Sequence, residues 1–216
     1  GVMLPNIAAL PLTWLAIGRI GAVMVPINVS YRERELAHVV SSADVTWLVA
    51  HEDCLPVIDA ARAHGQISIS PSRVIVVGDA DDEMIAWKDL ASDPRDTFAA
   101  PAPVGHDDLL NIQFTSGTSG FPKGCMLTHE YWMLVGCFGQ RQMGPRDDVR
   151  NVLIWAPFFY MDPLWQFLVA MRVGGTAFVA PRMSLTRFHD WLRQYQIHYC
   201  FYPEPALKQN PPSPLD

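Results

Sequence analysis

Charged residues are scarce in this chain, and they do not gather in one place. Asp, Glu, Lys and Arg make up 18% of the 216 residues, and the net charge is −6. No cluster of Lys and Arg gives the basic footprint of a nucleic-acid-binding protein. The hydrophobic fraction of 50% excludes the composition of an intrinsically disordered chain. The chain is therefore expected to be globular and to bury a sizeable core.

Paired cysteines and long apolar runs are also missing. Cys54, Cys125, Cys137 and Cys200 are far apart, form no CxxC pair and have no His at metal-ligand spacing. We therefore expect free, mostly buried thiols in a reducing compartment. No uninterrupted apolar run reaches the ~18 residues of a membrane span, and the first residues lack the basic start of a signal peptide. These features predict a cytoplasmic protein without a transmembrane segment.

Both ends of the sequence are abrupt. Residues 1–6, GVMLPN, are typical of the tail of a buried strand, and residues 203–216 run into Pro-rich sequence without a closing element. We expect a fragment, or the ordered part of a longer chain.

Short β-branched runs alternate with amphipathic helical patterns along the chain. Strands are expected at 2–4, 22–27, 45–50, 73–78, 109–115, 151–157, 176–180 and 198–202. Helices are expected at 7–20, after Ser30, at 53–64, after Thr128, at 163–172 and after Ser184. This alternation predicts an α/β fold with a largely parallel β-sheet covered by helices on both faces.

Several residues predict where the helices begin and end. Ser30 and Glu33 fit a capping box, and Gly65 fits a C-cap. Ser184 is expected to cap a helix whose apolar face comprises Leu185, Phe188, Trp191 and Leu192. The acidic, Pro-rich segment 79–108 is expected to be a surface connection with about one helical turn.

One stretch is too polar to belong to the core. Residues 115–120 are only Thr, Ser and Gly, and Pro122, Lys123 and Gly124 follow. Glycines at 117, 120 and 124 allow tight turns and close approach to a ligand. Successive backbone N–H groups form an anion site, to which Lys123 adds a cation and nearby side chains add hydroxyls. These hydroxyls come from Thr115, Ser116, Thr118, Ser119 and Thr128.

The position of this stretch and the spacing of its residues limit the kinds of ligand site that it can form. It follows the predicted strand 109–115, and ligands of parallel sheets bind beyond the carboxyl ends of strands. It is not a Walker A loop, because Lys123 lies between Pro122 and Gly124 and does not open a helix. The stretch therefore predicts a polyphosphate site of another kind, and we call residues 115–124 the phosphate loop.

The stretch FTSGTSGFPKG, residues 114–124, resembles the phosphate-loop signature of the adenylate-forming (AMP-binding) enzymes. That superfamily includes acyl-CoA synthetases, aryl-CoA ligases, luciferases and peptide-synthetase adenylation domains. Ser119 replaces the usual second Thr and keeps the hydroxyl. Segments 15–44 and 157–207 are similar to the blocks that flank the loop in this family. The narrower similarity is to CoA ligases of small or medium carboxylates, of the crotonobetaine/carnitine type.

The resemblance implies a reaction and its participants. In the family, the loop grips the β- and γ-phosphates of ATP while a carboxylate attacks the α-phosphate, and CoA then displaces AMP from the acyl-adenylate. By resemblance, this grip belongs to Lys123 and to Thr115, Ser116, Gly117, Thr118, Ser119 and Gly120. The resemblance also implies Mg²⁺, for which no ligand is assigned, and a place in fatty acid metabolism. Oriented donors matter because charge builds on the phosphoryl oxygens.

A second candidate site lies in PFFYMD, residues 157–162. By resemblance, Tyr160 is an aromatic gate between ATP and the acyl tunnel and acts in catalysis with Lys123; the alternative is an aromatic ring packed beside the loop. Asp162 before Pro163 predicts a helix N-cap; the alternative is a counter-charge for a cationic acyl substrate. His129, after the candidate cap Thr128, is expected to have a structural role at a helix end.

Motifs that the family carries farther along are not found by residue 216. The resemblance therefore implies that residues 1–216 are part of the N-terminal AMP-binding domain, without the C-terminal domain, and that this fragment alone is inactive. Two alternatives stay open: an adenylation domain that loads a carrier protein, and a non-catalytic nucleotide-binding remnant. Assembly into a homo-oligomer is a further expectation.

Overall fold

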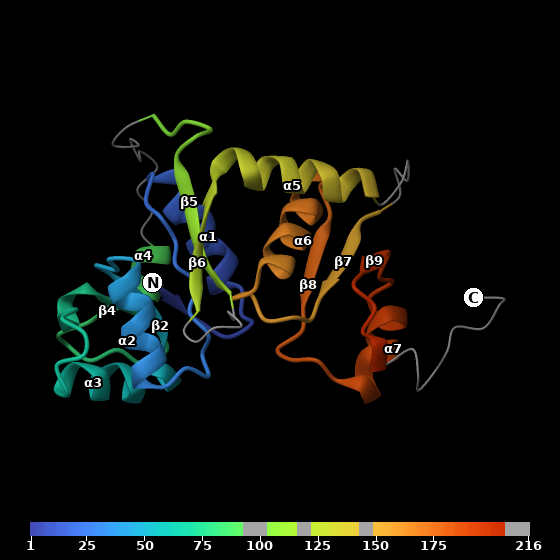
Figure 1. Cartoon of the computed structure of the whole chain (residues 1–216). Coiled ribbons are helices and arrows are strands. Elements are labelled where there is room, and N and C mark those ends of the chain that lie inside the picture. Colours follow the sequence, from blue (N-terminus) through green and yellow to red (C-terminus); the bar gives the residue numbers. More distant parts are fainter. Residues whose placement is uncertain (93–102, 116–121, 143–148, 206–216) are drawn as a thin grey trace. The chain divides into compact units, whose positions relative to one another are not determined.

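The computed structural model describes residues 1–92, 103–115, 122–142 and 149–205 (Figure 1). The chain divides into two compact units, Gly1–Tyr131 and Trp132–Asp216. Each unit has its own parallel strands, and the two are described in turn.

The first unit contains a four-stranded parallel sheet. Its strands are β1 (Val2–Met3), β2 (Leu48–His51), β3 (Val74–Val77) and β4 (Ile85–Ala86), in that spatial order. All three pairings are parallel. Leu48, Ala50, Val74 and Val76 are fully buried, which explains why these strands are short apolar runs.

The buried segment 24–27 joins this sheet to a second pair of strands. On one side, the Val2 N–H donates to the Val25 carbonyl and the Ile27 N–H donates to the Val2 carbonyl, both at 2.9 Å. On the other side, the Met24 N–H donates to Leu110 and the Ile112 N–H donates to Met24. The predicted strand 22–27 is therefore present only as isolated bridges at Met24 and Pro26, because Pro26 has no N–H for a regular ladder.

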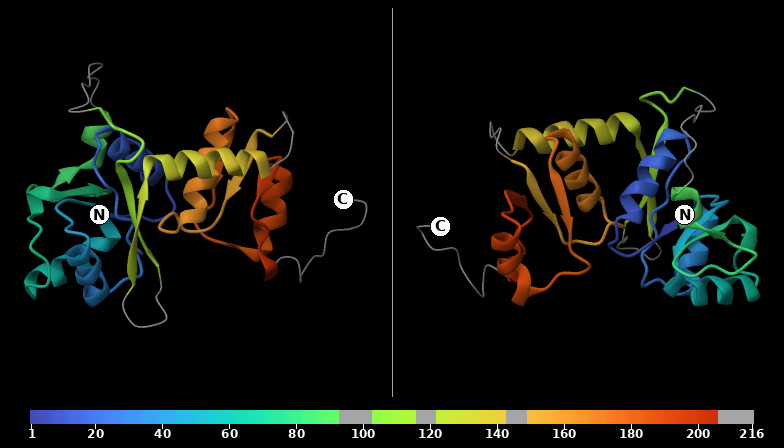
Figure 2. Two further views of the ribbon diagram at one scale, coloured as in Figure 1. Left: turned by 45° about the horizontal axis from the view of Figure 1, so that its top comes forward. Right: turned by 180° about the vertical axis from the view of Figure 1, so that it is seen from behind.

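The second pair of strands is an antiparallel hairpin. It consists of β5 (Leu109–Thr115) and β6 (Lys123–Thr128), which lie side by side in both views of Figure 2. The strand β5 was expected from its sequence, whereas β6 was not. The reason is that β6 is mostly exposed and begins with Lys123 and Gly124, so its sequence lacks the apolar run of a buried strand.

Among the described residues of the first unit, four complete helices accompany the strands. They are α1 (Ala9–Arg19), α2 (Glu33–Ser42), α3 (Leu55–Ala63) and the short α4 (Trp87–Ala91), with 3-10 turns η1 (Glu52–Cys54) and η2 (Pro71–Arg73). Leu36 and Val39 of α2 and Ile58 of α3 are fully buried in one core with the strands. Two indole N–H groups bind buried polar atoms: Trp14 donates to Asn111 at 2.7 Å and Trp87 donates to Thr13 at 3.0 Å.

The structure tests which residues cap the helices of the first unit. The capping box was predicted at Ser30 and Glu33, which was wrong: α2 begins at Glu33, and the Arg32 N–H donates to the Glu35 carboxylate at 3.2 Å. The Ser30 N–H instead donates to the Asn28 side chain. The prediction for Gly65 is confirmed, since it follows α3 with a φ of +66°, a conformation that glycine adopts without strain.

The segment 79–108 has more structure than its composition predicted. It contains strand β4 as well as α4, the expected helical turn. Residues 93–102 lie outside the described residues.

The second unit contains a three-stranded parallel sheet. Its strands are β7 (Asn151–Ile154), β8 (Thr176–Val179) and β9 (Tyr199–Cys200), in the order β8-β7-β9. They lie at the expected places but are shorter than predicted. The helices are α6 (Met161–Arg172), α7 (Leu185–Gln194) and α5 (His129–Gln142), which begins at the end of the first unit.

Helices α6 and α7 cover opposite faces of this sheet. Leu153, Phe178 and Cys200 pack with α7 in one apolar cluster. The adjacent residue Tyr199 points to the other face, where its ring lies 6.3 Å from Trp165 of α6. The predicted apolar face of α7 is confirmed, because Phe188 and Trp191 are buried and Leu185 and Leu192 pack beside them. Ser184 is the residue before α7, but its side chain accepts no capping hydrogen bond.

The predicted α/β class with largely parallel strands and helices on both faces is confirmed, with a parallel sheet in each unit. All four cysteines are free, but the expectation that most are buried was wrong: only Cys54 is buried, and Cys125 is exposed. Within the described ranges, no helix is both long and apolar enough to cross a membrane.

Candidate functional site

The hairpin β5–β6 holds the two ends of the phosphate loop opposite each other. Thr115, the last residue of β5, is the register partner of Lys123, the first residue of β6. The Thr115 hydroxyl donates to the Lys123 carbonyl at 3.5 Å. Five predicted site residues, Ser116, Gly117, Thr118, Ser119 and Gly120, lie outside the described residues. The structure therefore brings together the two ends of the predicted site, and the roles of all these residues stay predictions.

The Lys123 side chain is exposed at the mouth of this hairpin. In the part of the chain that the structure describes, no carboxylate pairs with its ammonium group. Lys123 begins a strand, which confirms that it does not open a helix as the lysine of a Walker A loop does. An unpaired cation here is suited to meet a phosphate.

His38 anchors the second end of the loop and was missed by the sequence interpretation. Its Nε2–H on α2 donates to the Pro122 carbonyl at 2.9 Å, across 84 positions of sequence. The imidazole also meets the Phe114 ring edge-on, at 6.2 Å between centroids. Helix α2 thus fixes the residue that precedes Lys123. No local pattern could have indicated this contact, since it depends on the tertiary fold.

Gly124 has a different role from the one predicted. It was expected to let the backbone turn tightly, but it lies inside β6, opposite Phe114, and does not adopt a positive φ. A Cβ at this position would lie 2.7 Å from Ile112 Cγ2, which is closer than packed carbons approach. The glycine therefore makes room for a neighbouring β5 side chain directly beside Lys123.

Tyr160 stands immediately before α6 and is 52% exposed. Its ring lies 4.6 Å from that of Phe159, at an interplanar angle of 55°. The phenol is therefore open to solvent on one side and supported by an aromatic ring on the other. Tyr160 and Asp162 lie near each other at the start of α6, in the second unit, whereas Thr115 and Lys123 belong to the first.

Asp162 is not the N-cap that the sequence predicted. Helix α6 begins at Met161, with Tyr160 at the cap position, so Asp162 lies in the first turn. Its carboxylate is exposed and accepts a hydrogen bond from Trp165 Nε1 at 3.3 Å. The prediction placed Pro163 at the first helical position, but proline is also accepted elsewhere in the first turn of a helix. A carboxylate in the first turn still interacts favourably with the positive end of the helix.

Gln166 is a buried polar residue that sequence reasoning also missed. It is 1% exposed, and its Nε2–H donates to the Asp162 carbonyl at 3.3 Å. Within the described ranges, its Oε1 atom has no hydrogen-bond partner. Buried polar atoms are normally paired. The available signal was a single Gln in the otherwise apolar run PLWQFLVAM, residues 163–171.

His129 has the structural position that the sequence predicted. It is the first residue of α5, and its backbone N–H donates to the Asp108 carbonyl at 3.0 Å. Thr128 is confirmed as the cap of this helix, since its hydroxyl accepts from the Tyr131 N–H at 3.2 Å. Across the described residues, no group of three His, Cys, Asp or Glu side chains could hold a metal ion.

The sequence belongs to the family of AMP-binding enzymes, whose family model matches residues 1–209. Among curated proteins, the chain is 28% identical over 187 residues to a crotonobetaine/carnitine–CoA ligase of Salmonella agona. That match covers 85% of this chain and 36% of the relative. The same values hold for the corresponding ligase of Salmonella typhi. The chain thus spans about a third of the length of the curated relatives it matches.

Solved structures share the fold of the chain. A long-chain-fatty-acid–CoA ligase from Archaeoglobus fulgidus superposes with a TM-score of 0.83 at 23% identity, over 97% of this chain and 40% of that one. A luciferase-like enzyme from the mealworm Zophobas morio gives a TM-score of 0.82 at 19% identity, over 99% of this chain and 49% of that one. The predicted membership in the AMP-binding family is confirmed by the family model, and these structures confirm the predicted fold.

Proposed function

We propose that the protein that contains this chain activates a carboxylic acid with ATP and transfers the acyl group to CoA. The observation that carries the proposal is the hairpin end, where Thr115 and Lys123 face each other across a family phosphate loop. The similarity to CoA ligases supports the choice of CoA as the acceptor. Residues 1–216 are then part of the N-terminal AMP-binding domain.

In this proposal, the phosphate loop holds the β- and γ-phosphates of ATP. Lys123 supplies a cation, and Thr115 with Ser116, Gly117, Thr118, Ser119 and Gly120 supplies hydroxyl and backbone donors. The carboxylate oxygen of the substrate attacks the α-phosphorus, the bond to the β-phosphate oxygen breaks, and pyrophosphate leaves with the electron pair. Donors that are already in place stabilise the charge that develops on the phosphoryl oxygens.

Tyr160 and Asp162 form the acyl side of the proposed site. The exposed Tyr160 ring gates the path between ATP and the acyl group. The exposed Asp162 carboxylate provides a counter-charge for a cationic acid of the crotonobetaine or carnitine type, as the names of the relatives indicate for those enzymes. The CoA thiolate then attacks the acyl carbon of the adenylate, and AMP leaves.

Mg²⁺ enters the proposal with ATP and not as a resident metal of the described residues. These residues offer no acidic cluster to hold it, so none is assigned as its ligand. A cytoplasmic location, where ATP and CoA are both present, and a place in fatty acid metabolism agree with this chemistry. Assembly into a homo-oligomer is part of the same proposal.

The deciding experiment uses the protein encoded by the complete reading frame. It should exchange pyrophosphate into ATP only when a suitable carboxylate is present, and it should then consume CoA with the same acid. A broad panel of carboxylates without exchange would rule out the proposal. Transfer to a phosphopantetheinyl carrier protein instead of CoA would identify an adenylation domain.

The chain alone, residues 1–216, is proposed to be inactive, since it spans 36% of the curated relatives. The same exchange assay on this chain tests that statement. Nucleotide binding without exchange by the complete protein would favour the remaining alternative, a non-catalytic nucleotide-binding remnant.

A further inference from the structure

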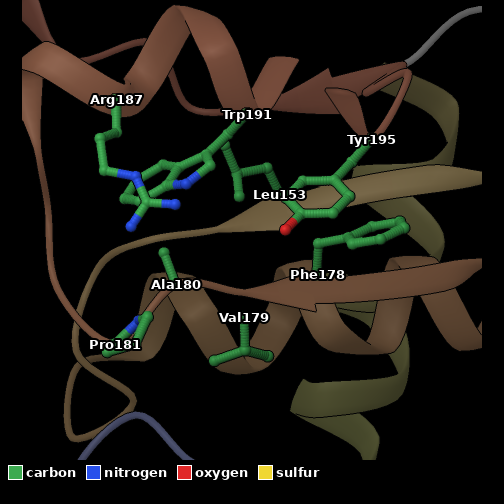
Figure 3. A pocket seen from close by; sticks show the side chains of 8 residues that line it. All are labelled: Leu153, Phe178, Val179, Ala180, Pro181, Arg187, Trp191 and Tyr195. Atoms are coloured by element: carbon green, nitrogen blue, oxygen red, sulfur yellow. The ribbon is translucent and has the colours of Figure 1, made fainter. Parts of the chain in front are cut away.

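The second unit contains a cavity of about 260 Å³ that the proposed chemistry does not use. Strands β7 and β8 line it from one side and helix α7 lines it from the other (Figure 3). On the strands, the cavity is lined by Leu153 of β7 and by Phe178 and Val179 of β8, with Ala180 just after β8. Tyr195, which follows α7, lies near the amino end of β7, where the Asn151 side chain donates to its carbonyl at 2.8 Å. The cavity therefore extends along the sheet face under α7.

The cavity is separate from the residues of the proposed acyl site within this unit. It lies on the sheet face that α7 covers, whereas Tyr160 and Asp162 stand at the start of α6, which covers the opposite face. Neither Tyr160 nor Asp162 lines it.

The walls of the cavity are suited to a flat apolar group. Phe178 and Tyr195 stack at 4.8 Å between ring centroids, with an interplanar angle of 26°. Trp191 is 7% exposed and belongs to the apolar cluster under α7, together with Leu153. Aromatic walls of this kind favour offset or edge contacts with a planar ligand.

Two hydrogen-bond donors converge on this apolar space. The Arg187 guanidinium lies 5.5 Å from the centroid of the Trp191 ring. Figure 3 shows this guanidinium and the Tyr195 hydroxyl pointing into the space between them. Within the described ranges, no carboxylate pairs with Arg187, whereas Arg193 on the same helix pairs with Asp190 at 3.8 Å. An apolar pocket with a few convergent polar groups is the usual form of a small-ligand site.

We propose that this cavity binds a small carboxylate with a flat apolar body, such as an aromatic carboxylate. Arg187 binds the carboxylate, the Tyr195 hydroxyl donates a second hydrogen bond to it, and Phe178 and Trp191 contact the ring. This site goes beyond the proposed function, because a carboxylate bound here does not take part in adenylation.

The experiment measures binding of 2-naphthoate to the protein encoded by the complete reading frame, by calorimetry without ATP. The variant Arg187→Gln should lower the affinity for 2-naphthoate by up to about fivefold, because the ion pair with an exposed guanidinium is lost. The matched variant Arg193→Gln, on the same helix but outside the cavity, should leave the affinity unchanged. The neutral 2-naphthamide should bind wild type and Arg187→Gln alike, and Tyr195→Phe should weaken 2-naphthoate less than Arg187→Gln does.

A second measurement separates this site from the proposed reaction. Carboxylate-dependent ATP–pyrophosphate exchange should be the same in wild type and Arg187→Gln. Absence of 2-naphthoate binding, an affinity that Arg187→Gln does not change, or inorganic phosphate binding as tightly as 2-naphthoate would each overturn the proposal. A parallel loss of binding and exchange in Arg187→Gln would place the cavity in the acyl site and overturn it as well. If wild type binds 2-naphthoate as expected but shows no exchange with any acid, the proposed function fails and the cavity proposal stands.

Discussion

Lys123 is the residue through which the proposed function is most directly tested. It is exposed at the start of β6, and no described carboxylate neutralises it. In Lys123→Ala the phosphates of ATP lose one charge-assisted contact, which is worth about 1.5–3 kcal/mol. We expect the KM for ATP to rise at least about tenfold, while the KM for the acid stays nearly constant. Steady-state exchange kinetics with each substrate varied in turn measure both values.

The control for this change is Lys88→Ala. Lys88 is also an exposed lysine, but it lies on α4 and has no place in the proposed site. The substitution Lys88→Ala should leave the KM for ATP and the KM for the acid unchanged. If Lys123→Ala raises the KM for ATP and the KM for the acid equally, Lys123 supports the hairpin and does not act on the phosphates.

Asp162 tests the charge of the acyl substrate. Because its carboxylate is exposed, a pair with a substrate cation is worth about 0.2–1 kcal/mol. Asp162→Asn should therefore raise the KM for a cationic acid by about 1.4-fold to fivefold and leave the KM for a neutral acid of similar size unchanged. The Asn oxygen can still accept from Trp165 Nε1, so the start of α6 is retained. The same KM change for both acids would argue against the counter-charge.

At the scale of elements, the packing of α5 on α6 depends on one glycine. A Cβ on Gly139 would lie 2.6 Å from Val169 Cγ2 and 2.8 Å from the Trp165 ring. A Cβ on Gly136, one turn earlier, would lie 3.4 Å from its nearest neighbours. Both residues are buried in the same helix, so they form a matched pair.

We expect Gly139→Ala to destabilise the protein by about 1–3 kcal/mol, because the methyl group overpacks this contact. Gly136→Ala should be neutral or stabilise it by up to about 1 kcal/mol, since alanine favours a helix over glycine. Urea denaturation of both variants measures the free energy of unfolding. Equal effects would mean that helix propensity, and not the packing against Trp165, determines the outcome.

The elements that the sequence predicted well are those with a local signal. Buried parallel strands such as β3 read as continuous apolar runs, and α7 shows its apolar face at helical spacing. The strand β6 has no such signal, because it is held by its ladder with β5 and is largely exposed. The start of α6 was misplaced because proline is accepted at more than one position of a first turn.

The residues of the candidate site can also be divided into those with a local sequence signal and those without one. The phosphate loop is a prediction from the sequence, since glycines, hydroxyls and a lysine at this spacing form a specific motif, and the structure describes only its two ends. The contact of His38 with Pro122 spans 84 positions, and no local pattern encodes it. The burial of Gln166 also depends on how α6 packs, so only the fold could reveal it.

At the scale of the whole molecule, the buried thiol of Cys54 and the partly buried thiol of Cys200 affect how stability changes in alkaline solution. Burial raises the pKa of Cys54 from its ordinary value of 9.0 to about 11, with a further contribution from Asp53, and burial raises the pKa of Cys200 to about 11 as well. The unfolded chain therefore releases these protons at lower pH than the folded one. The stabilising contribution is complete below pH 9 and is lost as the pH rises toward 11.

We expect the free energy of unfolding to fall by about 2 kcal/mol per thiol across this window. Denaturant titrations between pH 8 and 10.5 measure it. Cys54→Ala should flatten the pH dependence, whereas Cys125→Ala, at an exposed position, should not alter it. If Cys54→Ala shows the same change of unfolding free energy with pH as wild type, groups other than Cys54 cause the loss of stability in alkaline solution.

The segment 24–27 has a consequence for the growing chain during translation. Its outer edge forms hydrogen bonds with β5, and 87 positions separate Met24 from its bridge partner Asn111. At about 5–20 residues per second, the ribosome needs roughly 4–17 s to supply that partner. During this interval the nascent polypeptide presents an unpaired, apolar β-edge, and such edges recruit other chains. Slowing elongation within codons 25–110 should therefore increase aggregation of newly made protein, whereas slowing it after codon 130 should not.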